Sequence, residues 1–179
     1  MNVTFGQKAS FGTITNQNQT TMQNFKIELK WALLFIGMTW VWMIIERAVG
    51  LHDTYISQHP TYTNLVAIPA ILLYVLAMRE KRSQFYKGTM TYKQGVIFGL
   101  IMTGIITALV PLSQLVISNV ISPDYFKNAI EYSVSSGQAT QEEADSFFNI
   151  KSYIIQGMIG APIMAILTTL IVAIFVKKS

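Results

Sequence analysis

The sequence is organised around four long apolar blocks, which cover about residues 31–49, 62–78, 93–120 and 153–176. Within each block the apolar residues follow one another, without the alternation or the 3.6-residue spacing that gives an element one water-facing side. A helix needs about 20 such residues to cross a hydrocarbon layer ~30 Å thick. The pattern therefore predicts an all-α fold, an integral membrane bundle of four transmembrane helices.

The segment of about residues 122–152, between the third and fourth blocks, is polar and predicts a short external helical hairpin. Ser122 followed by Pro123 predicts an N-cap with proline at the first helical position, and Gly137 can end that helix. Thr140 with Glu143 three residues later has the form of a capping box for a second helix. Because the hairpin carries more acid than base, we expect it to dock over the outer end of the bundle rather than on anionic lipid.

Composition supports this assignment and removes several kinds of chemistry. Of the 179 residues, 51% are hydrophobic and 12% are charged, and the charged share is about half that of a soluble domain. The absence of cysteine excludes disulfides, thiolate metal sites and a cysteine nucleophile. Residues 1–25 are rich in Asn, Gln, Thr and Gly. We expect them to form a disordered polar tail ahead of a transmembrane domain over residues 26–179.

Basic residues gather in the loop after the second block and at both ends of the transmembrane region, at Lys26, Lys30, Arg79, Lys81, Arg82, Lys87, Lys93, Lys177 and Lys178. The loop after the first block has no lysine or arginine beyond Arg47 at its edge. Short loops rich in these residues stay in the cytoplasm. We therefore expect the second loop and both termini to lie in the cytoplasm.

Polar and helix-breaking residues within the spans gather in the outer half of the predicted bundle. They are Glu46, Gln114 and Gln156, with helix breaks at Pro69, Pro111 and Pro162. Polar groups in hydrocarbon need protein or water as partners. One hypothesis is a polar crevice lined by the three polar side chains and covered by the external hairpin. The alternative is that the prolines are ordinary kinks and that Glu46 lies at the membrane interface beside Arg47.

Small residues recur every four positions in the third and fourth spans, at Gly95, Gly99, Thr103 and Thr107 and at Gly157, Ala161 and Ala165. Such stripes let two helix backbones approach closely. We expect the two spans to pack against each other, or against a second copy of the chain.

Candidate metal ligands occur in the first external loop, at His52, Asp53 and His59, above Glu46. Imidazole and carboxylate groups can hold zinc or another divalent ion. Their spacing matches no established ligand pattern, so polar side chains on a loop surface are the alternative. The sequence predicts neither a metal nor another cofactor.

Motifs for catalysis and nucleic-acid binding are missing from the sequence. It contains no phosphate-binding glycine loop, no GxSxG elbow and no HExxH helix. Tyrosines at the ends of the blocks are typical of interfacial aromatic belts. We therefore expect no enzyme and no nucleic-acid partner.

Five stretches carry a resemblance to a known family: Gly-Leu-His-Asp at 50–53, Ala-Ile-Pro-Ala-Ile at 67–71, Met-Thr-Tyr-Lys-Gln-Gly at 90–95, Ile-Ser-Pro-Asp-Tyr-Phe at 121–126 and Phe-Asn-Ile-Lys-Ser-Tyr at 148–153. In this order and spacing the chain resembles a bacterial family of four-helix membrane proteins, domain of unknown function 4199. The resemblance implies the four-helix topology and the inner (cytoplasmic) membrane of a bacterium. It implies no substrate.

Three classes of function follow from these features. The first expectation is a non-enzymatic membrane component that binds a protein or lipid partner through its helix faces and external hairpin. The second is a small-solute transporter or channel subunit that acts as a homo-oligomer, because four spans are few for a complete transporter. The third is a membrane enzyme or metal-binding protein that uses Glu46, His52, Asp53 or His59. The expected partners are membrane lipids and either a second copy or another membrane protein.

Overall fold

The computed structural model describes residues 25–178. These residues are almost entirely helical, and they contain no β-structure beyond a single bridge between Met90 and Lys178. The predicted all-α fold is confirmed. The predicted N-terminal tail lies outside the described residues, apart from Phe25.

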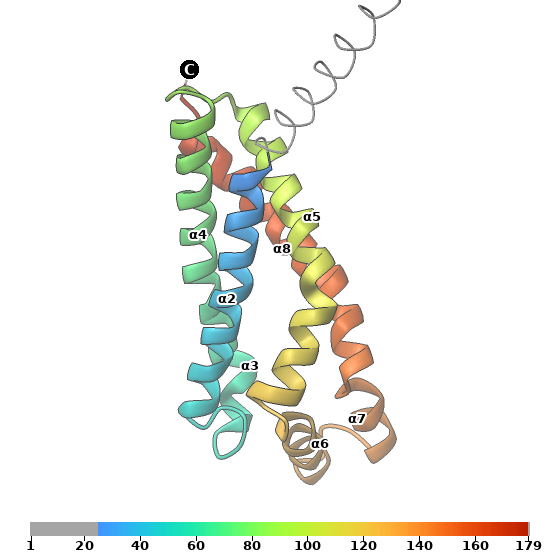
Figure 1. Ribbon diagram of the computed structural model, residues 1–179. Helices are drawn as coiled ribbons and strands as arrows, with labels where there is room; N and C mark the ends of the chain where they lie inside the picture. Colours follow the sequence, from blue (N-terminus) through green and yellow to red (C-terminus); the bar gives the residue numbers. More distant parts are fainter. Residues whose placement is uncertain (1–24, 179) are drawn as a thin grey trace, which may run out of the picture.

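Four helical runs are long and apolar enough to cross a membrane, and they confirm the four predicted spans: Lys26–Ala48, Ile56–Phe85, Tyr92–Ile121 and Ile150–Val176. Figure 1 shows these runs lying lengthwise beside one another. Both described ends of the chain lie at one end of the bundle, called here the terminal end (Figure 1). Two short helices lie across the opposite end, called here the hairpin end.

The elements follow one another in a simple order. The first run is α2 (Lys26–Ala48), and the second joins η1 (Ile56–Gln58), α3 (His59–Tyr62), η2 (Thr63–Val66), α4 (Ala67–Glu80) and η3 (Lys81–Phe85). The third joins α5 (Tyr92–Val116) and η4 (Ile117–Ile121), and the fourth is α8 (Ile150–Val176). The hairpin consists of α6 (Tyr125–Ser135) and α7 (Gln141–Phe147).

The second span is longer at both ends than the predicted range of 62–78. At its start, Pro60 occupies the first turn of α3, where its missing N–H costs nothing. At its end, the basic run does not stop the helix, because Lys81 forms a buried ion pair with Glu28, at 2.8 Å. The charge is thus neutralised inside the protein, and the helix continues as the π-helical turn η3.

The hairpin contains the two predicted short helices, but its first cap differs. The prediction that Ser122 is the N-cap was wrong: α6 begins at Tyr125, and the Ser122 hydroxyl lies 2.8 Å from a ring nitrogen of His52. Gly137 follows the end of α6 with a φ of +70°, as a glycine that ends a helix should. The capping box between Thr140 and Glu143 is confirmed.

Gly95 and Gly99 of the predicted α5 stripe meet α8 at Ala173 and Thr169, which lie beyond the predicted α8 stripe of Gly157, Ala161 and Ala165. A methyl group at Gly99 would lie 2.4 Å from Cγ2 of Thr169, and one at Gly95 would lie 3.3 Å from Cβ of Ala173. These two helices therefore pack backbone to backbone. Around this contact the core gathers Tyr74, Phe98, Met102, Ala77, Met78, Val172 and Val176.

Candidate functional site

A buried carboxylate lies in the last turn of α2. Glu46 is 1% exposed, and Trp42, one turn earlier on the same face, donates its indole N–H to Oε1 at 2.6 Å. Among the described residues, no lysine or arginine pairs with Glu46. The neighbouring Arg47 instead donates to the backbone carbonyl of Ile121 at 2.5 Å. A buried carboxylate without a permanent counter-charge needs another source of positive charge.

The turn after α2 brings a histidine back over this carboxylate. Gly50 has a φ of +83°, a conformation that side chains rarely adopt, and it reverses the chain. The backbone N–H of Leu51 donates to the carbonyl of Glu46 at 2.9 Å. As a result His52, which is 2% exposed, has its Nε2 atom 3.3 Å from Oε2 of Glu46.

A second histidine approaches the same oxygen from the start of α3. Nε2 of His59 lies 3.4 Å from Oε2 of Glu46, yet this nitrogen is buried and has no hydrogen-bond partner. The side chain of His59 is 15% exposed, so it forms the rim of the site. One atom from each of the three side chains falls within 4.8 Å of the other two. Glu46, His52 and His59 are called here the Glu46 cluster.

Helix α6 and Ser122, three residues before its start, contact the cluster and orient both imidazoles. Nδ1 of His52 lies 2.8 Å from the Ser122 hydroxyl, and Nδ1 of His59 lies 3.3 Å from the Tyr125 hydroxyl. Asn128 donates its side-chain N–H to the backbone carbonyl of His52 at 2.9 Å. Burial raises the pKa of Tyr125, so its phenol stays protonated. Each histidine thus has one nitrogen held by a hydroxyl and the other near Glu46.

This arrangement brings both imidazoles close to a carboxylate, which, when ionised, accepts hydrogen bonds and has no proton to donate. If Nδ1 of each histidine donates to its hydroxyl, each Nε2 presents a lone pair, and the carboxylate oxygen does the same. Three lone pairs that converge in a buried site repel one another unless a proton or a cation lies between them. The Glu46 cluster is therefore built to hold positive charge.

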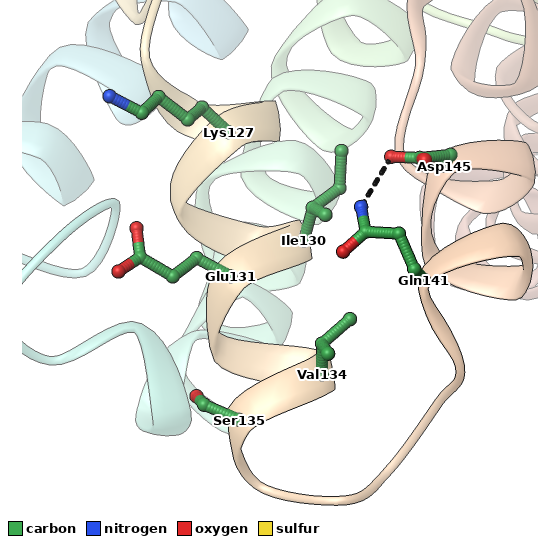
Figure 2. A pocket seen from close by; sticks show the side chains of 7 residues that line it. All are labelled: Lys127, Ile130, Glu131, Val134, Ser135, Gln141 and Asp145. Atoms are coloured by element: carbon green, nitrogen blue, oxygen red, sulfur yellow. Dashed lines mark hydrogen bonds between the residues drawn. The ribbon is translucent and has the colours of Figure 1, made fainter.

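The opposite side of α6 forms a groove with α7. Figure 2 shows Ile130 and Val134 of α6 one helical turn apart, with Gln141 and Asp145 of α7 facing them across the groove. The groove has a volume of about 680 Å³ and is also lined by Lys127, Glu131 and Ser135. The side chain of Gln141 donates to Asp145 at 3.1 Å, which fixes the polar wall (Figure 2). It is called here the hairpin groove.

Sequence comparison places this architecture in a family. The family model for proteins of unknown function, DUF4199, matches residues 30–178, nearly the whole described chain. The chain belongs to the DUF4199 family. No curated protein and no solved structure matches it. The family membership confirms the resemblance drawn from the sequence motifs, and the site must be interpreted from its own geometry.

Two of the three loop residues proposed as metal ligands join the Glu46 cluster in this DUF4199 protein, and the third does not. Asp53 is exposed, and its carboxylate accepts from the backbone N–H of Thr54. That backbone hydrogen bond lowers the pKa of Asp53. The side chain is thus engaged in a local turn instead of the cluster.

The two glutamines proposed to share a crevice with Glu46 form hydrogen bonds within their own helical runs. Gln114 donates to Ser118 at 2.9 Å, and Gln156 donates to Ser152 at 2.9 Å, each within its own helical run. No hydrogen bond among the described residues joins either glutamine to Glu46. Pro111 and Pro162 lie inside α5 and α8, and Pro69 lies in the first turn of α4.

Sequence reasoning missed the groups that surround the cluster. Trp42 lies four residues before Glu46, and this helical spacing puts both on one face, so the pair was detectable. The sequence predicts a helix cap at Ser122, and it predicts interfacial positions for Tyr125 and Tyr153. The hydroxyls of these two tyrosines lie 3.2 Å apart, and that of Tyr125 is next to His59. No local pattern links these residues to a histidine more than sixty positions away.

Proposed function

We propose that this DUF4199 protein is a non-enzymatic membrane component that binds a partner protein in the hairpin groove. The observation that carries the proposal is the groove itself, an apolar floor of Ile130 and Val134 between charged and polar walls. Its volume of 680 Å³ falls within the range of about 300–1,000 Å³ that is usual for binding pockets. Such a groove accommodates a few apolar side chains of a partner segment.

The groove is held in a fixed position by contacts on the other side of α6. Tyr125 is buried against His59 and Tyr153, and Asn128 is bonded to the backbone of His52. Ile130 and Val134, two and six positions after Asn128, point to the other side of α6 and line the groove, where they can meet a partner. A surface that is ordered before binding loses less entropy when a partner docks, which favours recognition over a loose contact.

Charge indicates what kind of partner fits. Over residues 122–152 the chain has five acidic side chains and two basic ones, which are Asp124, Glu131, Glu142, Glu143 and Asp145 against Lys127 and Lys151. This negative segment repels anionic lipid headgroups and attracts a positively charged surface. We therefore expect the occupant to be a segment of another protein with apolar residues flanked by lysine or arginine.

The proposal includes an orientation, with the terminal end in the cytoplasm of a bacterium and the hairpin end outside its inner membrane. The terminal end carries most of the lysine and arginine residues, among them Lys30, Lys87, Lys93 and Lys178. This asymmetry follows the positive-inside rule. The partner is accordingly expected to be a membrane protein or a protein of the outer compartment.

Site-specific photo-crosslinking in cells tests the partner. A photoreactive residue at Val134 lies in the groove, while the same residue at Gln138, an exposed hairpin position, serves as the matched control. We expect a discrete crosslinked product at Val134 and none at Gln138. Without a crosslinker, we expect Val134→Asp to abolish co-purification of the partner identified in that product. Equal products at both positions would contradict the proposal. A product with twice the mass of the chain would favour the homo-oligomer instead.

Cysteine labelling tests the orientation separately. The chain has no cysteine, so single variants give an unambiguous signal. A membrane-impermeant maleimide should label Ser135→Cys on intact cells, and it should label Thr89→Cys only after lysis. The reverse pattern would place the hairpin in the cytoplasm.

A further inference from the structure

We propose that the Glu46 cluster is a binding site for a divalent transition-metal ion of the zinc type, with Glu46, His52 and His59 as its protein ligands. This inference is independent of the hairpin groove and rests on donor chemistry, distances and burial. Two imidazole nitrogens and one carboxylate oxygen are a donor set that suits zinc and similar ions better than magnesium or calcium.

Two of the three distances between the ligand atoms match those of a metal site, and all three fall within 4.8 Å. Zinc binds histidine nitrogen and carboxylate oxygen at about 2.0–2.2 Å in tetrahedral geometry, which separates neighbouring ligand atoms by about 3.3 Å. Oε2 of Glu46 lies 3.3 Å from Nε2 of His52 and 3.4 Å from Nε2 of His59. Both separations are those of ligands that share one ion. They are longer than an ordinary charge-assisted hydrogen bond of about 2.7–2.9 Å.

Burial and the lack of other partners point the same way. Nε2 of His59 is buried without a hydrogen-bond partner, although the carboxylate is close to it. A buried polar atom left unpaired costs about 1–3 kcal/mol. Glu46, in turn, has no lysine or arginine partner among the described residues. A divalent ion at the centre of the cluster satisfies the free nitrogen and neutralises the carboxylate together.

The surrounding hydroxyls complete the pattern of a metal site. Metal-bound histidines usually donate their second ring N–H to a nearby acceptor, which fixes the ring and the tautomer. Here Ser122 holds Nδ1 of His52, and Tyr125 holds Nδ1 of His59. When Nδ1 of each ring donates to its hydroxyl, both Nε2 atoms present lone pairs to the carboxylate.

The chain has few side chains of the kinds that bind zinc through nitrogen or sulfur. It has two histidines and no cysteine, and both histidines lie in the cluster. They belong to different elements, the turn after α2 and the start of α3, so only the fold brings them to one carboxylate. Three protein ligands leave a fourth position of a tetrahedral ion for water or another small ligand.

Zinc binding to the purified full chain tests the site. The protein is prepared in detergent with an affinity tag that contains no histidine, stripped with a chelator and titrated with zinc against a chromophoric competitor. We expect one equivalent of zinc per chain, and we expect neither magnesium nor calcium to compete. Loss of a group that merely orients a ligand costs about 10- to 100-fold in affinity. Glu46→Gln and His59→Gln should therefore each weaken zinc binding by at least about 100-fold, and Ser122→Ala by about 10- to 100-fold.

Asp53→Asn is the matched control, because Asp53 neighbours His52 in sequence but lies outside the cluster. It should bind zinc like the unmodified chain. Gel filtration and circular dichroism establish that each variant is folded. Should Glu46→Gln fail to fold, His59→Gln at the rim and Ser122→Ala still decide the matter. Failure of the folded, unmodified chain to bind one equivalent of zinc would overturn the proposal, as would equal losses from Asp53→Asn and His59→Gln.

Discussion

The contact between α5 and α8 at Gly99 gives a sharp test of the packing. Gly99 of α5 faces Thr169 of α8, and a methyl group added at Gly99 would lie 2.4 Å from Cγ2, 2.5 Å from Oγ1 and 2.9 Å from Cβ of that threonine. Carbon atoms in contact normally lie about 3.5–4.0 Å apart. Gly99→Ala therefore forces the two helices apart by roughly 1 Å, because the fully buried, β-branched Thr169 has no room to turn away.

Gly104→Ala in the same helix isolates this steric effect. Nothing lies within 4 Å of a methyl group at Gly104. Both substitutions gain the same helix propensity, up to about 1 kcal/mol, so this gain cancels in their difference. Overpacking costs about 1–3 kcal/mol. We expect the Gly99→Ala chain to be less stable than the Gly104→Ala chain by that amount, which is about 5- to 150-fold in the folding equilibrium.

Unfolding by sodium dodecyl sulfate, followed by circular dichroism in mixed micelles, measures the difference. A double-mutant cycle with Thr169→Ala sharpens it, because that change removes the two closest atoms and leaves only Cβ at 2.9 Å. Gly99→Ala should then cost less than it does beside Thr169. Equal stability of the Gly99→Ala and Gly104→Ala chains would refute the close approach of α5 and α8.

Three further predictions concern the terminal end, the core and the hairpin. Lys81→Met should destabilise the protein by about 3–5 kcal/mol in detergent unfolding, because it leaves the buried Glu28 carboxylate uncompensated, and adding Glu28→Met should recover most of this loss. Tyr74→Phe should cost only about 0.5–1.5 kcal/mol in the same assay, because the Thr103 hydroxyl that it bonds still donates to the carbonyl of Gly99. Thr140→Ala should speed hydrogen exchange of α7 amides about fivefold, the loss of one cap worth about 1 kcal/mol. The backbone hydrogen bond from Thr140 lowers the pKa of Glu143, so the cap stabilises above the ordinary carboxyl pKa of 4.5 and weakens as the pH falls through the lowered value. The exchange difference should therefore shrink in acid, and a difference independent of pH would contradict the role of Glu143.

The spans were predictable because each residue of a transmembrane helix has to suit the lipid or the bundle around it, so a continuous apolar block is enough to identify one. The hairpin was predictable because the Thr140–Glu143 capping box lies within one helical turn and Gly137 acts at the end of its own helix. The limits of the second span were not. Its extension depends on Lys81 meeting Glu28 across the bundle, and a basic residue read locally indicates the end of a membrane segment.

In the candidate site, too, the sequence predicted what depends on nearby residues and not what depends on distant ones. The sequence pointed to Glu46 and to both histidines, because ionisable groups near a membrane helix are rare. It did not show that His59 joins the cluster whereas Asp53 does not. The choice depends on the turn at Gly50, on the start of α3 and on Tyr125 from beyond the third span. The three proposed ligands come from three elements, the end of α2, the turn after it and the start of α3, so their meeting depends on the fold.

The placement of charge along the spans favours a binding site at one end over a path through the bundle. Glu28 and Glu46 stand at opposite ends of α2, about 27 Å apart at 1.5 Å per residue, and residues 31–45 between them carry no charged side chain. The central parts of α4, α5 and α8 are equally free of charge. Secondary transporters place their substrate and ion sites near the middle of the membrane, where broken helices supply polar groups. Here, polar side chains in the central part of the bundle form hydrogen bonds with each other, such as Trp40 with Ser113 and Tyr74 with Thr103. The two candidate sites, the Glu46 cluster and the hairpin groove, lie on the two sides of α6 at the same end, so a partner and an ion would meet the protein from the same compartment.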